Sequence, residues 1–563
     1  MDDLRRAGEP AFPTAGRAGS FRADHGRDSG RPIRAPAPSR SLGGSFASAA
    51  MALVSAALFA GLVLRIMTYD LRRDEELYVP PTRLLDDRAL YADVLYNHTP
   101  GSAWLFHGLR RLTGSEHLLL DARLGVVLGW AGFALAIVWV AHSLTRSLAI
   151  GWSIAVLFLL QELFLTQAGM TATNNFLPLP LSFLGLGLAV IALIADRPKP
   201  WAMAGAGFCL ALAVVFKVSA VAFLPIVVAG AFLLPRDRSL SLRLRLGILP
   251  LALGGLAGGA PILVYLVVDP IRFIANVAGY HTGPHLQYYR SAAAPDEGAV
   301  MSLAGKLLLG HGTWIAGAAI GLVALVALLL LPRAEPGENE RPDGRPERDL
   351  LLFVLATFVV ASAFSLLPTP SFPQYFAPPL ICLPLALILA ARRLPANRQP
   401  LASGLLAIAA VVTIGTAAPR LLQHAGAIVN PGQWTVMRVH RQGQDIARVL
   451  AAAGLTGKVA TLAPVYPLEG GLPVYDELAT GPFAYRTAEF TAPELARHYR
   501  MTSPATVGAL LAADPPAALL LGFSPELERP MLDFATSNGY LADPGFELID
   551  RYGTARLYLR PNR

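Results

Sequence analysis

Three consecutive carboxylates, Asp74, Glu75 and Glu76, stand just after the first long apolar run of the chain and next to two arginines. A carboxylate at a membrane surface can act as a general base or as a metal ligand. Carboxylates of the same kind also occur in loops that only contact water. The elements that surround this acidic cluster, Asp74 to Glu76, therefore decide whether it carries chemistry.

Two basic residues elsewhere in the chain suit a phosphate group. Lys217 interrupts a run that is otherwise apolar on both sides, and an ionisable residue in a membrane span costs roughly 2.5–3.5 kcal/mol, so it usually has a partner or a function. A lysine that snorkels to the membrane surface is the alternative explanation. Arg123 is expected at the outer end of the second span, where it could bind phosphate or anchor the helix at the interface.

Further polar and aromatic candidates are expected on the same outer face, namely Tyr78, Asp93, His98, His281 and Tyr375. His98 precedes a Thr-Pro-Gly turn and could be a base, a sugar contact or an ordinary loop residue. Tyr375 could equally belong to an interfacial aromatic belt. His281 and His285 are four residues apart without a third ligand, so we predict no metal and no cofactor, although a divalent ion could bind.

The composition indicates that a polytopic helical membrane protein positions these residues. The chain has 563 residues, of which 54% are hydrophobic and 15% charged, whereas soluble domains carry about 25% charged residues. The apolar residues form separate runs long enough to cross a bilayer. We expect about eleven spans, at residues 46–67, 119–142, 150–165, 176–195, 201–216, 218–234, 247–268, 313–331, 351–367, 375–391 and 401–416.

The distribution of arginine and lysine predicts the orientation of these spans. With the N-terminus in the cytoplasm, the Arg-rich short loops fall on the cytoplasmic face, as the positive-inside rule requires. These loops lie around residues 146, 197–199, 236–245, 333–348 and 392–398. The net charge of +8 is therefore an orientation signal, and we expect no nucleic-acid partner. An odd number of spans places the C-terminus outside.

The composition changes near residue 420 and indicates a second kind of structure. We expect a small α/β domain with helices at 434–453, 505–512 and 525–538 and strands at 458–462, 517–521, 546–550 and 555–559. It contains no Gly-rich phosphate loop, Cys/His cluster or nucleophile elbow, so we predict the chemistry in the membrane part. The expected division is a disordered cytoplasmic tail at 1–44, a transmembrane catalytic domain at 45–419 and an extracytoplasmic, periplasmic domain at 420–563.

In their shared order, these motifs resemble the polyprenyl-phosphate-sugar glycosyltransferases of the GT-C fold. That group includes the protein O-mannosyltransferases of glycosyltransferase family 39 and the bacterial aminoarabinose transferases that act on lipid A. The resemblance covers most of residues 46–420. It is carried by Asp74-Glu75 with Tyr78, Tyr91-x-Asp93 with His98-Thr99-Pro100-Gly101, Ala122-Arg123-Leu124, Phe216-Lys217, and Gln374-Tyr375-Phe376-Ala377-Pro378-Pro379. It departs at Asn174 and Asn175, where relatives often place an acid, and at Gln374, where some branches place a base.

The resemblance implies a GT-C fold and an inverting transfer of a hexose or pentose from a polyprenyl-phosphate donor. The acceptor would be a glycan, lipid or protein of the envelope, on the outer face of a bacterial inner membrane. Asp74 would be the base, with Glu75 in support, and Lys217 and Arg123 would bind the donor phosphate. Contacts to the acceptor or the sugar would come from Tyr78, Asp93, His98, His281 and Tyr375.

A multi-span transporter or flippase of lipid-linked sugars is the alternative, because such proteins also have many spans and buried charges. Transport predicts charges near the bilayer midplane and helices interrupted by Gly or Pro. The polar candidates are instead expected at one outer face, which favours an interfacial enzyme. A glycan-assembly scaffold without catalysis is a third interpretation, and it requires Asp74 to be dispensable.

Overall fold

The computed structural model describes residues 42–291, 300–332 and 345–561. The predicted disordered tail, residues 1–44, lies almost entirely outside these ranges. Residues Ala57–Arg563 belong to one compact unit. The expected domain boundary between residues 419 and 420 therefore stays a prediction.

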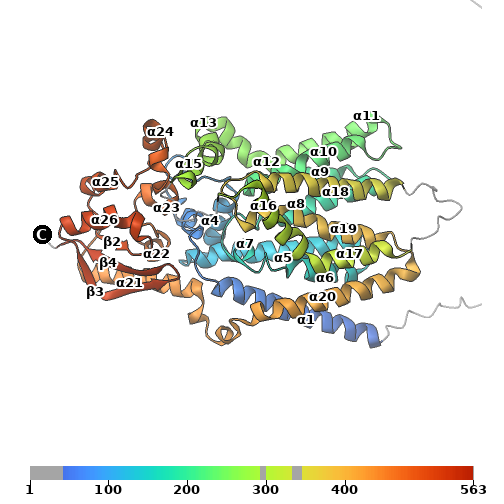
Figure 1. Ribbon diagram of the computed structural model, residues 1–563, viewed down its shortest axis with the longest axis horizontal. Coiled ribbons are helices and arrows are strands. Elements are labelled where there is room, and N and C mark those ends of the chain that lie inside the picture. Colours follow the sequence, from blue (N-terminus) through green and yellow to red (C-terminus); the bar gives the residue numbers. More distant parts are fainter. Residues whose placement is uncertain (1–41, 292–299, 333–344, 562–563) are drawn as a thin grey trace, which may run out of the picture. The chain divides into compact units, whose positions relative to one another are not determined.

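The described residues form a multi-pass helical membrane protein. Figure 1 shows its long helices lying side by side. Six segments are long and apolar enough to cross a membrane: Ala50–Thr68 in α1 (Leu42–Thr68), Leu118–Thr145 (α5), Leu240–Val268 ending in α12 (Leu249–Val268), Glu347–Leu366 in α18 (Arg345–Leu366), Pro373–Arg392 ending in α19 (Cys382–Arg392), and Ala396–Leu422 ending in α20 (Gln399–Leu422). A seventh candidate joins Leu303–Ala316, which contains α16 (Leu303–His311), to α17 (Ala319–Leu330) at a 58° bend.

Shorter apolar helices complete the membrane part. They are α6 (Leu148–Leu159), α8 (Pro178–Ile194), α9 (Pro200–Phe216) and the segment Val218–Leu233, which ends in α10 (Leu224–Leu233). Helices of 10–17 residues cover only part of a bilayer unaided. The expected total of eleven spans therefore stays a prediction, while the expected helical membrane architecture is confirmed.

The break at Lys217 confirms the expectation that residues 201–234 form two helices. Lys217 has an extended backbone (φ −153°, ψ 123°) and ends α9, and a 3₁₀ turn over Val218–Phe223 leads into α10. Pro225 near the start of α10 suits this restart, because the first turn of a helix tolerates proline. The lysine consequently stands at a helix end instead of in the middle of a span.

The first long loop folds into three short helices, α2 (Glu75–Tyr78), α3 (Pro81–Leu84) and α4 (Gly101–Thr113). The expected amphipathic stretch after Pro100 forms α4, which ends at Gly114 in the left-handed region. A Cβ atom on Gly101 would lie 2.7 Å from the carbonyl oxygen of Val215. Glycine therefore lets the start of α4 approach the end of α9, next to Lys217.

The second long loop is also helical and supplies histidines and tyrosines. It contains α13 (Pro270–Ile274), a π-helical turn over Ala275–Gly279, α14 (Tyr280–Thr282) and α15 (Pro284–Arg290). Residues 292–299 lie outside the described residues. This loop places His281, His285 and Tyr289 within one short stretch.

The C-terminal region contains a four-stranded sheet in the order β1-β2-β4-β3. β1 (Val459–Ala460) pairs in parallel with β2 (Ala518–Leu521), and β4 (Gly553–Leu559) is antiparallel to both β2 and β3 (Leu541–Asp550). The main helices are α21 (Thr435–Ala452), α25 (Val507–Ala513) and α26 (Pro525–Ser537). Each of these elements lies within a few residues of its expected place, because their apolar periodicities are regular.

Glycines bring α9 and α12 into close contact and so hold the helix that ends at Lys217. A Cβ atom on Gly254 would lie 1.9 Å from the carbonyl oxygen of Ala204, and one on Gly258 would lie 2.2 Å from that of Phe208. Real Cβ atoms do not approach backbone this closely. The two helices can therefore pack at this distance only with glycine on α12.

Gly254→Ala should destabilise the protein, because the added methyl group forces α9 and α12 apart. Overpacking of this kind costs about 1–3 kcal/mol, so the thermal unfolding temperature in detergent should fall. The matched control is Gly404→Ala in α20, where no atom lies within 4 Å of the new Cβ atom. Equal unfolding temperatures for the two variants would show that α9 and α12 do not pack closely at Gly254.

Candidate active site

One large cavity of about 1300 Å³ brings most of the candidate residues together. This volume exceeds the roughly 300–1,000 Å³ that is usual for small-molecule sites. The lining comes from the first loop, the segment after α6, the break at Lys217, α14 and α15, the start of the Pro373–Arg392 span, and the C-terminal region. Of the predicted site residues, it includes Asp74, Tyr78, His98, Lys217, His281 and Tyr375.

Asp74 precedes α2 and is half-buried at the cavity wall. Gln167 Nε2, on α7 (Gln167–Met170), donates a hydrogen bond to Asp74 Oδ2 at 2.9 Å. Burial raises the pKa of Asp74, and the Gln167 hydrogen bond and the positive charges of Arg486 and Lys217 oppose that rise. A carboxylate with a raised pKa accepts a proton more readily than an ordinary aspartate.

Glu75 and Arg123 form a fully buried ion pair, with both side chains 0% exposed. Arg123 Nε donates to Glu75 Oε1 at 3.0 Å and Arg123 Nη2 donates to Oε2 at 2.9 Å. The backbone N–H groups of Ala172 and Arg72 donate to the same carboxylate at 2.9 and 3.0 Å. All sides of this carboxylate are therefore engaged in holding the loop, α5 and the segment before α8 together.

The expected role of Arg123 as a phosphate ligand stays a prediction, and the structure gives its guanidinium group other partners. Besides Glu75, its Nη1 donates to the carbonyl oxygens of Ile66 and Tyr69 at 2.8 and 2.7 Å. Neither Arg123 nor Glu75 is among the residues that line the cavity. The sequence shows the charge of Arg123 but not its buried partner Glu75. The ion pair between them stabilises the packing of the first loop against α5. Glu75 fixes the place of Asp74 in the chain, and its negative charge also helps to raise the pKa of Asp74.

Lys217 faces the cavity with amide and aromatic neighbours. Its Nζ donates to Asn175 Oδ1 at 2.6 Å and lies 4.8 Å from the centre of the Tyr375 ring. No ion pair of Lys217 occurs among the described residues, so its charge is not neutralised by a direct carboxylate contact. Asn175 is a neutral amide, so its contact with Lys217 leaves the positive charge of the ammonium group uncompensated.

Tyr78, His98 and His281 form a row of rings in the cavity wall. The Tyr78 and His98 rings are stacked with centroids 5.0 Å apart, and those of His98 and His281 are 5.2 Å apart. Tyr78 Oη donates to Asn174 Oδ1 at 2.7 Å. Burial and the neighbouring His281 hold the pKa of His98 well below its usual value. Burial thus favours the neutral form of the His98 imidazole.

Asp93 is not among the residues that line the cavity, and its predicted contact with a sugar or acceptor stays a prediction. Its Oδ2 accepts a hydrogen bond from the backbone N–H of Ala89 at 2.8 Å, and its Oδ1 lies 3.4 Å from Arg500. The carboxylate therefore closes a turn of the first loop. Short-range bonding of this kind is common for aspartate in loops.

Several lining residues were not predicted from the sequence, among them Gln167 and Arg486. Gln167 lies in the polar stretch between two expected spans, which could have indicated it. Arg486 lies in the C-terminal region, which contains no recognisable motif. Among the residues that the structure describes, no group of three or more His, Cys, Asp or Glu side chains is placed to hold a metal ion, and the expectation of a metal-free site stays a prediction.

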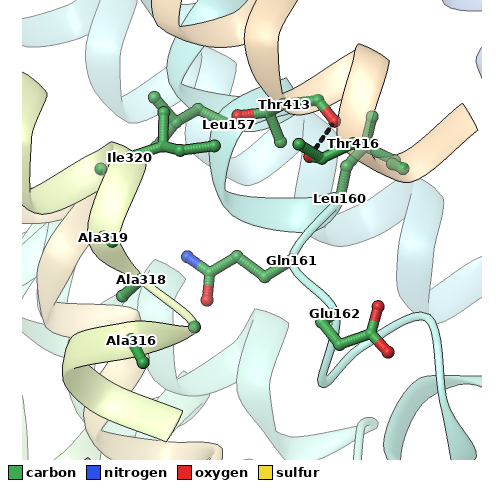
Figure 2. Close-up of a pocket in the computed structure, with 13 residues that line it drawn as sticks. Leu157, Leu160, Gln161, Glu162, Ala316, Ala318, Ala319, Ile320, Thr413 and Thr416 are labelled. Atoms are coloured by element: carbon green, nitrogen blue, oxygen red, sulfur yellow. Dashed lines mark hydrogen bonds between the residues drawn. The ribbon is translucent and has the colours of Figure 1, made fainter. Parts of the chain in front are cut away.

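A second cavity of about 240 Å³ adjoins this site and shares Gln161, Glu162 and Gly317 with its lining. Figure 2 shows Gln161 and Glu162 on the segment after α6, with the turn before α17 opposite and Thr413 and Thr416 on α20 above. Glu162 is paired with Arg420. Apart from these polar groups the wall is mainly aliphatic.

Arg123→Gln should destabilise the protein strongly, because it leaves the buried Glu75 carboxylate without its cation. Breaking a buried pair on one side costs about 3–5 kcal/mol, which should lower the unfolding temperature by many degrees. The double variant Glu75→Gln/Arg123→Gln should regain part of the loss. A single variant with normal stability but impaired lipid-phosphate binding would restore the ligand role.

Glu76 should make stability depend on pH. Its side chain is buried, accepts a hydrogen bond from Val465 N at 3.0 Å, and has a pKa raised by burial to about 8 from its ordinary 4.5. The folded state thus favours the protonated acid, and this stabilisation is present at pH 4.5 and is lost as the pH rises through 8.

Glu76→Gln should remove this dependence, because the amide copies the neutral acid. Unfolding temperatures at pH 5 and pH 8.5 should differ less in Glu76→Gln than in the wild type. Glu494→Gln, at an exposed site in α24 (Pro493–His498), should retain the wild-type difference. An unchanged difference in Glu76→Gln would contradict the assignment.

Comparison with solved structures identifies the fold. No protein-family model and no curated protein matches the sequence. The structure of ArnT from Cupriavidus metallidurans in the apo state matches over 92% of this chain and 98% of its own, with a TM-score of 0.61 and 16% identity. The structure of the same protein bound to undecaprenyl phosphate matches over 91% and 98%, with a TM-score of 0.56 and 17% identity. The chain is therefore a membrane protein with the GT-C fold.

Proposed function

We propose that this protein is an inverting glycosyltransferase that moves a sugar from a polyprenyl-phosphate donor to a hydroxyl group of an envelope acceptor. The observation that carries the proposal is the placement of Asp74 and Lys217 in the wall of one large cavity. The reaction requires a base that accepts the proton of the acceptor hydroxyl and a positive charge that stabilises the departing phosphate. Asp74 and Lys217 supply these two groups at one site. The GT-C fold and the location in a membrane fit a donor that arrives through the bilayer.

Lys217 serves the phosphate of the donor in this proposal. Its ammonium group is held by Asn175 and Tyr375 and has no carboxylate within ion-pair distance among the described residues. Ammonium binds phosphate as a point charge. The structural similarity to ArnT bound to undecaprenyl phosphate supports a lipid phosphate as the donor group. Of the two predicted phosphate ligands, only Lys217 is assigned to the donor phosphate, because Arg123 forms a buried ion pair with Glu75.

The transfer is a single displacement whose atoms balance without a cofactor. The acceptor oxygen forms a bond to the anomeric carbon while the bond from that carbon to the phosphate oxygen breaks. The hydroxyl proton passes to the Asp74 carboxylate, and the polyprenyl phosphate leaves with the electron pair. The leaving phosphate gains one negative charge, and Lys217 stabilises this charge as it develops.

The remaining wall residues suit the sugar. Tyr78 and His98 present stacked rings, and Tyr375 adds a third ring with Lys217 Nζ over its face. Aromatic faces together with hydrogen-bonding edges bind sugars by apolar contact and by directed donors. We infer contacts to the transferred sugar or the acceptor from Tyr78, His98, His281 and Tyr375. Hexose and pentose donors both fit these residues.

We also infer the membrane placement. The positive-inside pattern puts the Arg-rich loops in the cytoplasm, and the first loop with Asp74 on the opposite face. The C-terminal region contributes Phe483, Arg486 and Tyr552 to the same cavity, which supports its placement on that outer face. In a bacterium this is the periplasmic side of the inner membrane.

Asp74→Asn should lower the transfer rate strongly and leave donor binding nearly intact, since the amide keeps the shape but cannot accept the proton. Removal of a general base typically lowers the rate by about 10²–10⁴-fold. The measurement is transfer of labelled sugar from a polyprenyl phosphate to membrane acceptors. In the wild type the rate should also fall as acid protonates Asp74, at a pH above the usual aspartate range because burial raises the pKa of this carboxyl.

Asp93→Asn is the matched control, because Asp93 is on the same loop but outside the cavity lining. It should keep activity within a few-fold of the wild type. Turnover at the wild-type rate in Asp74→Asn would rule out the base assignment and would favour a transporter or a scaffold.

A further inference from the structure

Arg486 brings a positive charge to the cavity from the C-terminal region. It follows α23 (Pro482–Tyr485) directly, and its backbone N–H donates to the carbonyl oxygen of Pro482 at 3.0 Å. Its guanidinium carbon lies 4.7, 5.0 and 5.3 Å from the ring centres of Phe483, Tyr288 and Tyr289. Three aromatic faces thus fix the plane of this guanidinium at the cavity wall.

The N–H groups of this guanidinium are not used to hold the protein together. No ion pair of Arg486 occurs in the part of the chain that the structure describes, and its buried Nε has no hydrogen-bond partner there. Arg73, which lines the same cavity, behaves differently. Its guanidinium is engaged by Ser524 and by the carbonyl oxygen of Phe523 at 3.1 Å. Arg486 is therefore preorganised by stacking yet open for a ligand.

The charge balance of the cavity indicates more than one bound anion. Its lining includes five basic residues and only two carboxylates, namely Arg72, Arg73, Lys217, Arg290 and Arg486 against Asp74 and Glu162. Glu162 is already paired with Arg420. A single donor phosphate at Lys217 would leave Arg486 without a counter-charge in a partly dehydrated site, which is unfavourable.

Lys217 and Arg486 come from different structural elements and have different neighbours. Lys217 lies at the break between two membrane helices, against Asn175 and Tyr375. Arg486 packs on α15 of the second long loop and belongs to the region that follows the last membrane helix. Asp74, Lys217 and Arg486 all line the same cavity. The candidate base therefore shares one cavity with two positive charges that distinct parts of the chain supply.

We propose that Arg486, with the rings of Tyr288 and Tyr289, forms a second anion subsite that binds a phosphate or carboxylate group of the acceptor. The guanidinium fork binds such oxyanions through paired hydrogen bonds. The subsite positions an acceptor hydroxyl near Asp74 while the donor phosphate occupies Lys217. The inference rests on the proposed function, and it restricts the acceptor to molecules that carry a negative group near the reactive hydroxyl.

The test is the stabilisation of the purified full-length protein by inorganic phosphate, measured as thermal unfolding in detergent with and without saturating undecaprenyl phosphate. Phosphate should still raise the unfolding temperature of the lipid-loaded wild type, because the second subsite is unoccupied by the lipid. In Arg486→Gln this response should require at least about tenfold more phosphate. The affinity for undecaprenyl phosphate should change less than about twofold in Arg486→Gln and fall about tenfold or more in Lys217→Gln.

Two further variants make the outcome decisive. Arg290→Gln removes another cavity cation, one whose side chain is exposed, and should respond to phosphate as the wild type does. Arg486→Lys keeps the positive charge but lacks the paired N–H groups of the guanidinium, so its response to phosphate should be intermediate. This variant also tests the proposal if Arg486→Gln does not fold.

Three results would overturn the proposal: no phosphate response in lipid-loaded wild type, an equal loss in Arg290→Gln, or a tenfold loss of undecaprenyl phosphate binding in Arg486→Gln. The last result would place Arg486 in the donor subsite. Failure of undecaprenyl phosphate to bind the wild type would contradict the proposed donor instead, and the lipid-free phosphate arm would still test Arg486.

Discussion

The buried ion pair between Glu75 and Arg123 is the interaction on which the position of the candidate base depends. Two ionised groups that are 0% exposed are stable only when each satisfies the other. Here the carboxylate also accepts the N–H groups of Ala172 and Arg72, so one side chain ties the first loop to α5 and to the segment before α8. Asp74 is the preceding residue, and its direction into the cavity follows from this anchor.

The same segment before α8 arranges the other polar groups. Asn174 holds Tyr78 and Asn175 holds Lys217, at 2.7 and 2.6 Å. Two neutral amides thus stand where a charged residue would compete with a phosphate for the lysine. The cavity lining thus combines membrane-helix ends, such as the break at Lys217, with residues of α15 and with Phe483 and Arg486. In the proposed function, the membrane-helix ends face the lipid donor and the C-terminal region contributes to the acceptor site.

Much of this arrangement could be predicted from the sequence, because patterns of polarity report the environment of each segment. The broken helix at Lys217, the C-terminal helices and strands, and the gathering of Asp74, Lys217, His98 and Tyr375 followed from such patterns. The pairing of charges did not. Arg123 and Lys217 have the same sign and similar predicted depth, but only the folded chain shows that one meets Glu75 and the other meets Asn175. Arg486 was missed because the tyrosines against which it packs lie nearly two hundred positions earlier in the chain.

The central claim is that Lys217, and not Arg123, binds the donor phosphate beside Asp74. An experimental structure of the protein in a lipid nanodisc with undecaprenyl phosphate tests it most directly. The account predicts phosphate density within hydrogen-bond distance of Lys217 Nζ, about 3 Å, with Arg123 still bound to Glu75. Phosphate density on Arg123, or at a site outside the cavity that Asp74 lines, would contradict it.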